Sequence, residues 1–492
     1  MTAPSRLVWM SIGWLLLPNL IFLLGWLTPW LSVPLVVGLL WIWGKKQEFR
    51  TKEPSGKDQG KWWLLGFALV WTWLSGIGGF AWQRADYLKH DLVWHDLLQQ
   101  DWPIVYEQGE MLVYYLGYYL VSGGLAKLLG SGLLPWATMI WSGLGMWLAA
   151  RWWQYHSELR WGWVVLGMSV FAGLDGVQIA TAASYEWLSL GQLSWIRIAP
   201  IEGHLPAVWG LGHRIPANFS QLAWTPQHAI AGWVCTGVLW AGVREGNNLS
   251  HIGWVWALLW IHSPMVAIGT TPLLLMPVLQ GKFRELLRWE HLLIGGALLG
   301  IMLAYFGSHA PLSEKGWIWE TATVGHWWWL VPLFWFWEVG LLIGLLWKLR
   351  PSTRNWLLLG GGFIALLCVF RLGYYHDLLM RASLPMMMIL GIISLQALSE
   401  SVQEKFRAPF QKALLLFWLI GAAAPVQEQV KSLIYTVRGQ TDFRMKQIPA
   451  DWDMRNVDDC YQQQDIPHPF ELAPQYLGNE ESFWGRYLMR RP

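Results

Sequence analysis

Cysteine and charged residues are scarce in this sequence. The 492 residues include only three cysteines, Cys235, Cys368 and Cys460, and their spacing builds neither a disulfide framework nor a metal site. Charged residues make up 14% of the chain, against about 25% in an average soluble domain. The basic residues mark short loops and form no stripe, so nucleic acid is not expected as a partner.

Nucleotide-binding and hydrolase motifs are also missing. The chain has no GxxxxGK[ST] loop, no GxGxxG after a strand and no GxSxG turn. Nucleotide hydrolysis therefore has no support. No period of about 20 to 50 residues repeats along the sequence, which excludes a solenoid.

Apolar residues are the abundant component: 54% of the chain is hydrophobic and 42 residues are tryptophan. Many apolar runs approach the roughly 20 residues that a helix needs to cross a hydrocarbon core of about 30 Å. The sequence therefore predicts an all-α polytopic transmembrane helical bundle of about 11–14 spans. The spans are expected near 8–28, 30–44, 62–80, 133–150, 161–182, 226–243, 251–268, 290–307, 327–347, 355–370, 384–398 and 410–426.

Short basic segments predict the orientation of that bundle. The connection 45–61 holds six Lys or Arg, and the segments 282–288, 348–354 and 404–412 are also basic. The positive-inside rule assigns all four to the cytoplasm. Alternation then puts the other long loops on the outer face. These loops are expected near 81–110, 184–225, 308–326 and 371–383.

The segment 111–130, MLVYYLGYYLVSGGLAKLLG, is ambiguous. It is either a span or a tyrosine-rich helix at the membrane interface, where rings with polar tips prefer to lie. The interfacial version gathers the polar segments on one face, provided that a short Pro-interrupted pass over 270–281 restores the alternation. The chain then divides into a transmembrane domain, 1–426, and a polar outer-face tail, 427–492.

The stretch DYLKHDLVWHDLLQQDWP, residues 86–103, is unusually polar for this chain. On a helix Asp86 and His90 lie four positions apart on one side, so the carboxylate can hold the imidazole or share a metal. Asp91 points to roughly the opposite side and is kept as a third catalytic candidate. A divalent cation, Mg²⁺ or Mn²⁺, held by Asp86 and a substrate phosphate suits this set better than zinc. A solvated amphipathic helix is the plainer alternative.

A second polar cluster lies between residues 184 and 228, among Gly and Pro residues that interrupt any long helix. Charges are costly near membrane depth unless they face water or a protein-lined cavity, so this density favours a site. Each residue taken alone is more readily explained as structural. The candidates are Arg197, Glu202, His204, Arg214 and His228.

The third cluster, FRLGYYHDLLMRASLP, lies at the outer entrance to a predicted span. Arg371 and Arg381 with Tyr374 suit a phosphate or pyrophosphate, because guanidinium groups make bidentate contacts and stay charged. His376 and Asp377 are further substrate-binding candidates. Asp377 and Arg381, four positions apart, equally fit a structural ion pair.

Two ionisable residues stand alone inside predicted spans. They are His262, in LLWIHSPM, and Glu338, in WFWEVGLL. Either residue lines a cavity or is paired with a partner that the sequence does not reveal.

An acidic first outer loop directly after a span, followed by outer arginines and a polar tail, resembles the GT-C class of membrane glycosyltransferases. The matching residues are Asp86 and His90 in ADYLKHD, followed by WPIVYEQGEMLVYYLGYYL. Protein mannosyltransferases of that class carry Asp-Glu-x-His-Phe, whereas this chain reads DYLKH. The likeness is architectural across roughly 80–430, and it is greatest to uncharacterised bacterial members of the class.

This resemblance implies an enzyme that moves a sugar from a polyprenyl-phosphate donor to an unknown acceptor on the outer face of a bacterial inner membrane. Asp86 with His90 would act as the base or as a metal-associated acid. Arg371 and Arg381, with Arg197 or Arg214 in reserve, would stabilise the departing lipid phosphate. The expected partners are membrane lipid, the donor and the acceptor.

Two other classes of protein remain open. A transporter or flippase would use the same charges, with the Gly- and Pro-broken segments 200–228 and 264–281 as discontinuous helices around a substrate. A noncatalytic scaffold subunit would explain the polar tail but not the clusters. The concentration of charge in loops on one face favours the enzyme, because a carrier is expected to place charge near the midplane.

Overall fold

The computed structural model describes residues 6–45, 60–175, 177, 212–245, 249–309, 315–322, 325–373, 375–440, 448–464 and 471–491. These residues are predominantly helical, in agreement with the predicted all-α class, and their strands form two short two-stranded ribbons. By length and composition, five helices in them are able to cross a membrane. They are Arg6–Trp26, Ser131–Ser157, Trp327–Leu349, Leu384–Gln403 and Pro409–Val437.

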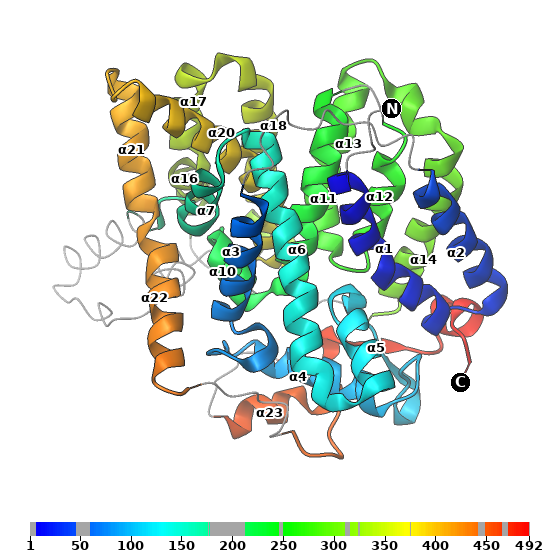
Figure 1. The fold of residues 1–492 in the computed structure, drawn as a ribbon. Helices are drawn as coiled ribbons and strands as arrows, with labels where there is room; N and C mark the ends of the chain where they lie inside the picture. The colour runs from blue at the N-terminus through cyan, green and yellow to red at the C-terminus, as the bar shows by residue number, and fades with distance from the viewer. Residues whose placement is uncertain are drawn as a thin grey trace.

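The N-terminal helices form an antiparallel pair. Helix α1 (Arg6–Trp26) turns at Leu27 and Thr28 into α2 (Pro29–Gly44). Proline is tolerated at the first position of α2, because the first N–H groups of a helix have no partner within the helix. The next helix, α3 (Lys61–Leu74), packs along α6 (Leu134–Ser157) near the middle of the molecule (Figure 1).

The polar stretch after α3 folds at one end of the bundle. Helix α4 (Tyr87–Gln99) contains most of it, and α5 (Leu120–Leu129) packs beside α4 (Figure 1). Most of the polar residues of α4 are buried. Helix α5 has 10 residues, which is about 15 Å and half of a hydrocarbon core. This geometry fits the interfacial version of 111–130.

In the middle of the chain, the 7-residue helix α12 (Ile252–Leu258) and the 16-residue helix α13 (Pro264–Leu279) form a pair that turns back inside the bundle. Asn19 Nδ2 donates a 3.0 Å hydrogen bond to the carbonyl oxygen of Leu258, and the His262 ring stacks on Trp14. Because Trp14 and Asn19 lie midway along α1, the turn after α12 lies inside the molecule. The helices of this region are α7 (Trp161–Val170), α10 (Asn218–Trp224), α11 (Pro226–Glu245), α12 (Ile252–Leu258) and α13 (Pro264–Leu279).

The C-terminal half repeats the up-and-down pattern. A π-helical turn, Phe336–Gly340, joins α16 to α17, and a short ribbon pairs β2 with β3. The elements are α14 (Gly296–Phe306), β2 (Lys315–Trp317), α15 (Ile318–Thr321), α16 (Trp327–Trp335), α17 (Leu341–Leu349), α18 (Arg354–Leu367), β3 (Phe370–Leu372), α19 (Asp377–Ala382), α20 (Leu384–Gln403), α21 (Pro409–Gly421) and α22 (Ala423–Val437).

The two ends of the bundle differ in chemistry. The basic connections after α13, α17 and α20 lie together at the upper end in Figure 1. There Arg350 donates 2.8 Å to Gln396 Oε1, and Gln396 donates 3.0 Å to the carbonyl of Ser157. Helices α4 and α23 (Val457–Gln463) and the C-terminus lie at the opposite end.

The C-terminal tail is folded onto that opposite end. Helix α22 continues to Val437, so the polar tail begins after the boundary predicted at residue 426. Strand β4 (Leu477–Asn479) pairs with β1 (Glu110–Leu112), and Tyr476 and Trp484 are buried. The tail also bonds the end of α1, where Arg490 N donates 2.8 Å to the Trp26 carbonyl.

A buried carboxylate fastens the tail to α4. Asp96 Oδ2 accepts hydrogen bonds from the Tyr106 hydroxyl at 2.5 Å and from the Met454 N–H at 3.0 Å.

Tyr106→Phe removes one of these bonds, and a bond to a charged group contributes about 1.5–3 kcal/mol. We expect amide exchange in 448–464 to accelerate about 10- to 100-fold by mass spectrometry. Tyr487→Phe, a substitution at an exposed position, should leave the amide-exchange rate of 448–464 unchanged. Equal exchange rates in the two variants would contradict the role of Tyr106.

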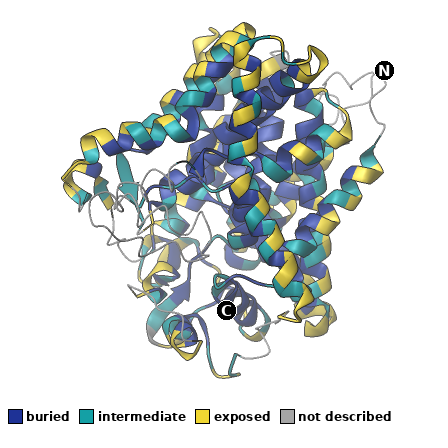
Figure 2. Ribbon diagram, turned by 90° about the vertical axis from the view of Figure 1, so that its left-hand side faces the viewer, coloured by how far each residue is buried: buried dark blue, intermediate teal, exposed yellow. Residues whose placement is uncertain are grey.

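Large apolar side chains remain exposed along the outer helices. Figure 2 shows exposed residues on the outer surfaces of the helices and buried residues in the centre. Trp30 and Val37 of α2, Leu416 and Leu419 of α21 and Leu433 of α22 are among the exposed ones. A water-soluble monomer rarely exposes contiguous apolar patches beyond a few hundred Å².

Candidate functional site

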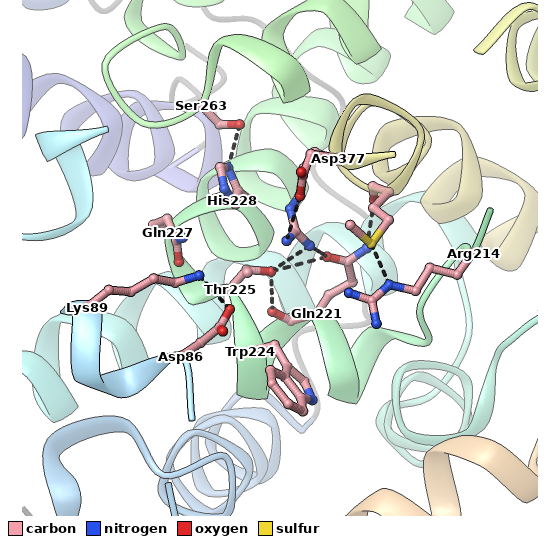
Figure 3. A network of polar contacts seen from close by, with 12 residues as sticks. Asp86, Lys89, Arg214, Gln221, Trp224, Thr225, Gln227, His228, Ser263 and Asp377 are labelled. Carbon is pink, nitrogen blue, oxygen red and sulfur yellow. Dashed lines mark hydrogen bonds and ion pairs between the residues drawn. The ribbon is translucent and has the colours of Figure 1, made fainter. Parts of the chain in front are cut away.

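The first turn of α4 presents a carboxylate and an ammonium together. Asp86 is the N-cap residue of α4, and Lys89 Nζ lies 2.8 Å from Asp86 Oδ2. Their side chains keep 22% and 16% of their surface exposed. Solvent therefore reaches this pair, although apolar helices surround it. Figure 3 shows the pair facing residues of α10, α11 and the region of α19.

Arg381 of α19 approaches the same place from the other half of the chain. Its Nη1 donates 3.0 Å to Thr225 Oγ1 and 3.3 Å to Gln221 Oε1, and its Nη2 lies 3.8 Å from Asp377 Oδ1 (Figure 3). Asp377 and Arg381 thus form the ion pair that their spacing suggested. Because the pair also belongs to the cluster around Asp86, the structural and the substrate-binding explanations of Arg381 do not exclude each other.

Electrostatics keep the Asp86 carboxyl ionised. Burial raises the pKa of Asp86, but the positive charge of Lys89, with help from Arg381, outweighs it and holds the pKa below its ordinary value. A carboxylate in this state can accept a proton or hydrogen bonds from a substrate hydroxyl.

His90 is buried beside this pair and is neutral. Its Nε2 lies 3.3 Å from the Trp224 carbonyl oxygen and its Nδ1 lies 2.5 Å from the Tyr119 hydroxyl. A carbonyl only accepts, so we assign the proton to Nε2, and Tyr119 then donates to Nδ1. Burial and the neighbouring Lys89 charge lower the pKa of His90 to about 4, against the opposing effect of Asp86.

The low pKa of His90 predicts a pH-dependent stability. The unfolded chain, with a His pKa near 6.5, takes up this proton before the folded chain does. Stability is therefore complete above about pH 6.5 and falls by roughly 3 kcal/mol between there and about pH 4. His90→Gln should lose less unfolding free energy than wild type between about pH 7 and pH 4.5. Equal losses in the two proteins would contradict this assignment.

Further polar and aromatic groups surround the cluster. His228 Nδ1 bonds Ser263 Oγ at 2.7 Å, and the His228 ring lies edge-on to Tyr115, with 5.0 Å between centroids. Gln227 Nε2 is 3.4 Å from the Tyr114 hydroxyl, and Tyr114 packs on Tyr476 of the tail with 4.7 Å between centroids. Aromatic faces of this kind stack on sugar C–H groups and on isoprenoid chains.

Arg214, Arg371 and His376 lie at the side of the cluster that is remote from Asp86. Arg214 Nε contacts Met380 Sδ at 2.7 Å and its guanidinium lies 5.4 Å from the Tyr375 ring. Arg371 is in β3 and donates 3.3 Å to the Thr321 carbonyl. His376 is buried against His213, with 4.5 Å between ring centroids.

The remaining predicted residues are separate from the cluster or not described. Asp91 is buried on the opposite side of α4, where it acts electrostatically on Tyr87 and Tyr118. It is therefore turned away from Asp86, as the helical spacing predicts. Arg197, Glu202, His204 and Tyr374 lie outside the described residues.

Sequence reasoning missed several members of the cluster. The sequence places Lys89 three positions after Asp86, a spacing that brings two side chains together on a helix. Lys89 was nevertheless not predicted as a site residue. Thr225 and Gln221 gave no signal of their own, because single neutral polar residues are common at helix ends. Tyr114 and Tyr115 stood within a tyrosine-rich segment whose position the sequence left open.

The arrangement favours an anionic ligand over a metal. Lys89 and Arg381 bring two positive charges to Asp86, and Lys89 occupies one of the carboxylate oxygens to which a divalent cation would bind. In the described part of the chain, no three His, Cys, Asp or Glu residues converge in a way that would hold a metal ion. A phosphate group suits the two cations, and a hydroxyl suits the carboxylate.

Comparison with known proteins identifies no relative of this chain. No family model matches the chain, and no curated protein or solved structure is significantly similar to it. The cluster itself, its position at one end of the bundle and the exposed apolar surface are therefore the features that bear on function.

Proposed function

We propose that the chain is a multi-pass membrane glycosyltransferase of a bacterial inner membrane, using a polyprenyl-phosphate sugar as donor. The membrane part of this proposal is supported by the exposed apolar side chains of α2, α21 and α22 and by the five helices of sufficient length. Lipid tails would cover these side chains, and helices satisfy their own backbone hydrogen bonds in lipid.

The proposed orientation follows from the two chemically different ends. Lys282, Arg284 and Arg288 after α13, and Lys348 and Arg350 at the C-terminal end of α17, mark the cytoplasmic end under the positive-inside rule. Helix α4 and the tail are at the other end of the molecule, so they face the outside. A lipid-linked sugar on the outer leaflet would then reach the cluster from the surrounding bilayer.

The meeting of Asp86, Lys89 and Arg381 is the observation that carries the enzyme proposal. It joins an ionised, partly exposed carboxylate with two cations, supplied by segments nearly 300 residues apart in the sequence. Transfer from a lipid phosphate needs both functions, namely a proton acceptor for the incoming hydroxyl and cations for the departing phosphate.

In the proposed reaction, the acceptor hydroxyl oxygen forms a bond to the anomeric carbon while the bond from that carbon to the phosphate oxygen breaks. Asp86 accepts the hydroxyl proton. The lipid phosphate leaves with the bonding electron pair, and Lys89 and Arg381 stabilise its charge. His90 is a positioning residue, because its two hydrogen bonds fix the start of α4 against Trp224 and Tyr119.

The direct test is label transfer from a panel of radiolabelled polyprenyl-phosphate sugars. Membranes that contain the chain are compared with matched membranes that lack it. We expect label to move from the donor lipid to a second fraction with at least one donor. If folded protein transfers label from none of them, the glycosyltransferase proposal is wrong.

A transporter or flippase is the second candidate, and the turned-back pair α12 and α13 favours it. Discontinuous helices that meet inside a bundle surround the substrate in many carriers. A flippase would leave the label on its lipid but would move it to the other leaflet. A membrane-impermeant reagent that cleaves the lipid-linked sugar distinguishes this outcome from transfer.

A further inference from the structure

The imidazole of His228 uses only one of its two ring nitrogens inside the protein. Nδ1 lies 2.7 Å from Ser263 Oγ, whereas no described residue forms a hydrogen bond with Nε2. The residue is 4% exposed, and Nε2 itself is not fully buried. His90 differs, because Trp224 and Tyr119 occupy both of its ring nitrogens. His228 therefore has one ring nitrogen to offer to a ligand.

The bond to Ser263 determines which nitrogen of His228 carries the hydrogen. Ser263 is the N-cap residue of α13, and its Oγ accepts a 3.2 Å hydrogen bond from the Val266 N–H. Within the described chain, the other partner of Oγ is His228 Nδ1, so the hydroxyl hydrogen points to that nitrogen. Nδ1 then accepts, and the neutral ring carries its hydrogen on Nε2. His228 thus presents an N–H donor on the side that faces away from Ser263.

This donor lies beside the cations of the Asp86 cluster. His228 is in the first turn of α11, and its backbone N–H bonds the carbonyl of Thr225, whose hydroxyl accepts 3.0 Å from Arg381 Nη1. Figure 3 shows His228 between Ser263 on one side and Lys89 and Thr225 on the other. The charges of Arg381 and Lys89 both act on the His228 ring. Donors from α4, α11 and α19 therefore gather in one region.

The orientation of the His228 ring is fixed before any ligand binds. Ser263 holds one edge of the ring, and Tyr115 packs against it edge-on, with 5.0 Å between the ring centroids. Tyr115 is in turn held against Phe306 of α14, with 5.9 Å between centroids. A donor that is already oriented needs little rearrangement when charge develops on a ligand.

We propose that His228 is a third donor for the departing lipid phosphate, and that Ser263 is the positioning residue that keeps the hydrogen on Nε2. This inference rests on the proposed sugar transfer and specifies how its leaving group is held. The third terminal oxygen of the phosphate forms when its bond to the sugar breaks, and Lys89, Arg381 and His228 then supply one donor group for each oxygen. His228 neither gains nor loses a proton, and as a neutral donor it adds no repulsion between the two cations.

Nitrogen-15 NMR of histidine-labelled protein in detergent tests the position of the hydrogen, and His228→Gln identifies the His228 signals by their loss. We expect wild type to show a hydrogen on Nε2 and none on Nδ1. Farnesyl phosphate, a short polyprenyl monophosphate, should shift the Nε2 signal, whereas farnesol, which lacks the phosphate, should not. A hydrogen on Nδ1, or an Nε2 signal that farnesyl phosphate leaves in place, would overturn the proposal.

Titration with farnesyl phosphate measures the contribution of the donor to affinity. His228→Phe should raise Kd about 10- to 100-fold, because a hydrogen bond to a charged oxygen is lost. His228→Gln keeps an N–H donor of similar reach and should restore most of the affinity. His156→Phe is the matched control, since His156 is buried between Trp152 and Trp240 in another part of the bundle. An equal Kd for wild type and His228→Phe would refute the role of His228.

Inorganic phosphate in the same titration separates the two sources of this chemistry. We expect it to bind more weakly than farnesyl phosphate, because it lacks the apolar chain that the surrounding aromatic rings would cover. Equal affinity for the two would assign the site to free phosphate and would overturn the assignment to a lipid phosphate.

Two substitutions of Ser263 test its positioning role. Ser263→Ala removes the hydroxyl, so the hydrogen should be distributed over both nitrogens of His228 and the affinity for farnesyl phosphate should fall. Ser263→Thr keeps the hydroxyl and the cap of α13, and it should restore the wild-type spectrum and affinity. If Ser263→Ala keeps the hydrogen on Nε2, Ser263 has no positioning role.

Label transfer distinguishes failure of this inference from failure of the proposed function. If label moves from a donor but farnesyl phosphate leaves the His228 signals unchanged, sugar transfer takes place without this donor and the inference is wrong. If farnesyl phosphate binds through His228 but no donor transfers its label, the phosphate site stands and the glycosyltransferase proposal is wrong.

Discussion

Asp86→Asn is expected to lower label transfer by about 10²–10⁴-fold at equal expression, because an amide cannot accept the proton of the acceptor hydroxyl. The substitution keeps the size and shape of the side chain, and Lys89 and Arg381 remain to bind the donor phosphate. The loss should therefore fall on kcat, with little change in KM for the donor. Initial rates over a range of donor concentrations separate the two constants.

The matched control for this variant is Asp101→Asn. Asp101 is exposed just beyond the end of α4, so its substitution should change the rate by less than about twofold. If Asp86→Asn retains wild-type transfer, Asp86 has no part in the chemistry. If both variants lose activity equally, the loss reflects the charge or fold of the segment and not the position of Asp86.

The ion pair with Lys89 adds a pH dependence to the same prediction. Lys89 holds the pKa of Asp86 below its ordinary value against the effect of burial, so the wild-type rate should decline only at pH values below the usual carboxyl range. Lys89→Met removes that charge, and the decline of the rate should move to higher pH. A pH profile that does not move would mean that another group controls the proton transfer.

The helical class of the fold was predictable from the sequence because its cause is local. Continuous apolar runs satisfy their backbone only as helices, and these runs became helices such as α1 and α20. The end of α22 was less predictable. Residues 427–437 contain Gln427, Glu428 and Lys431, which suggested a polar tail, but Glu428 turns inward to Arg84 and the helix continues.

The candidate site was predictable only in part, because its members come from separate segments. The Asp377–Arg381 ion pair was found from spacing along a single helix. The contact expected between Asp86 and His90 is not formed, because Asp86 pairs with Lys89 and the His90 ring nitrogens bond Tyr119 and Trp224. The meeting of Asp86 with Arg381 across α10 and α11 depends on tertiary packing, which the sequence pattern does not encode. The contribution of the tail, through Tyr476 against Tyr114, was hidden for the same reason, since it depends on the pairing of β1 with β4.

Arg84→Met is expected to destabilise the folded protein by about 3–5 kcal/mol, because it leaves the Glu428 carboxylate buried without its cation. Arg84 Nη2 lies 2.7 Å from Glu428 Oε2, both side chains are buried, and the guanidinium also lies 4.1 Å from the Trp82 ring. The pair joins the segment after α3 to α22, so its loss should also loosen the start of α4. Unfolding of purified protein in mild detergent measures the change.

A double substitution separates the ion pair from the packing of its side chains. In Arg84→Met with Glu428→Leu both charges of the buried pair are removed, and two apolar side chains of similar length fill the space. Replacing a buried pair in this way is often neutral or stabilising, so the double variant should be more stable than Arg84→Met alone. If the two substitutions simply add, the cost of Arg84→Met arises from lost contacts such as that with Trp82, and the charge of Glu428 plays no part in it.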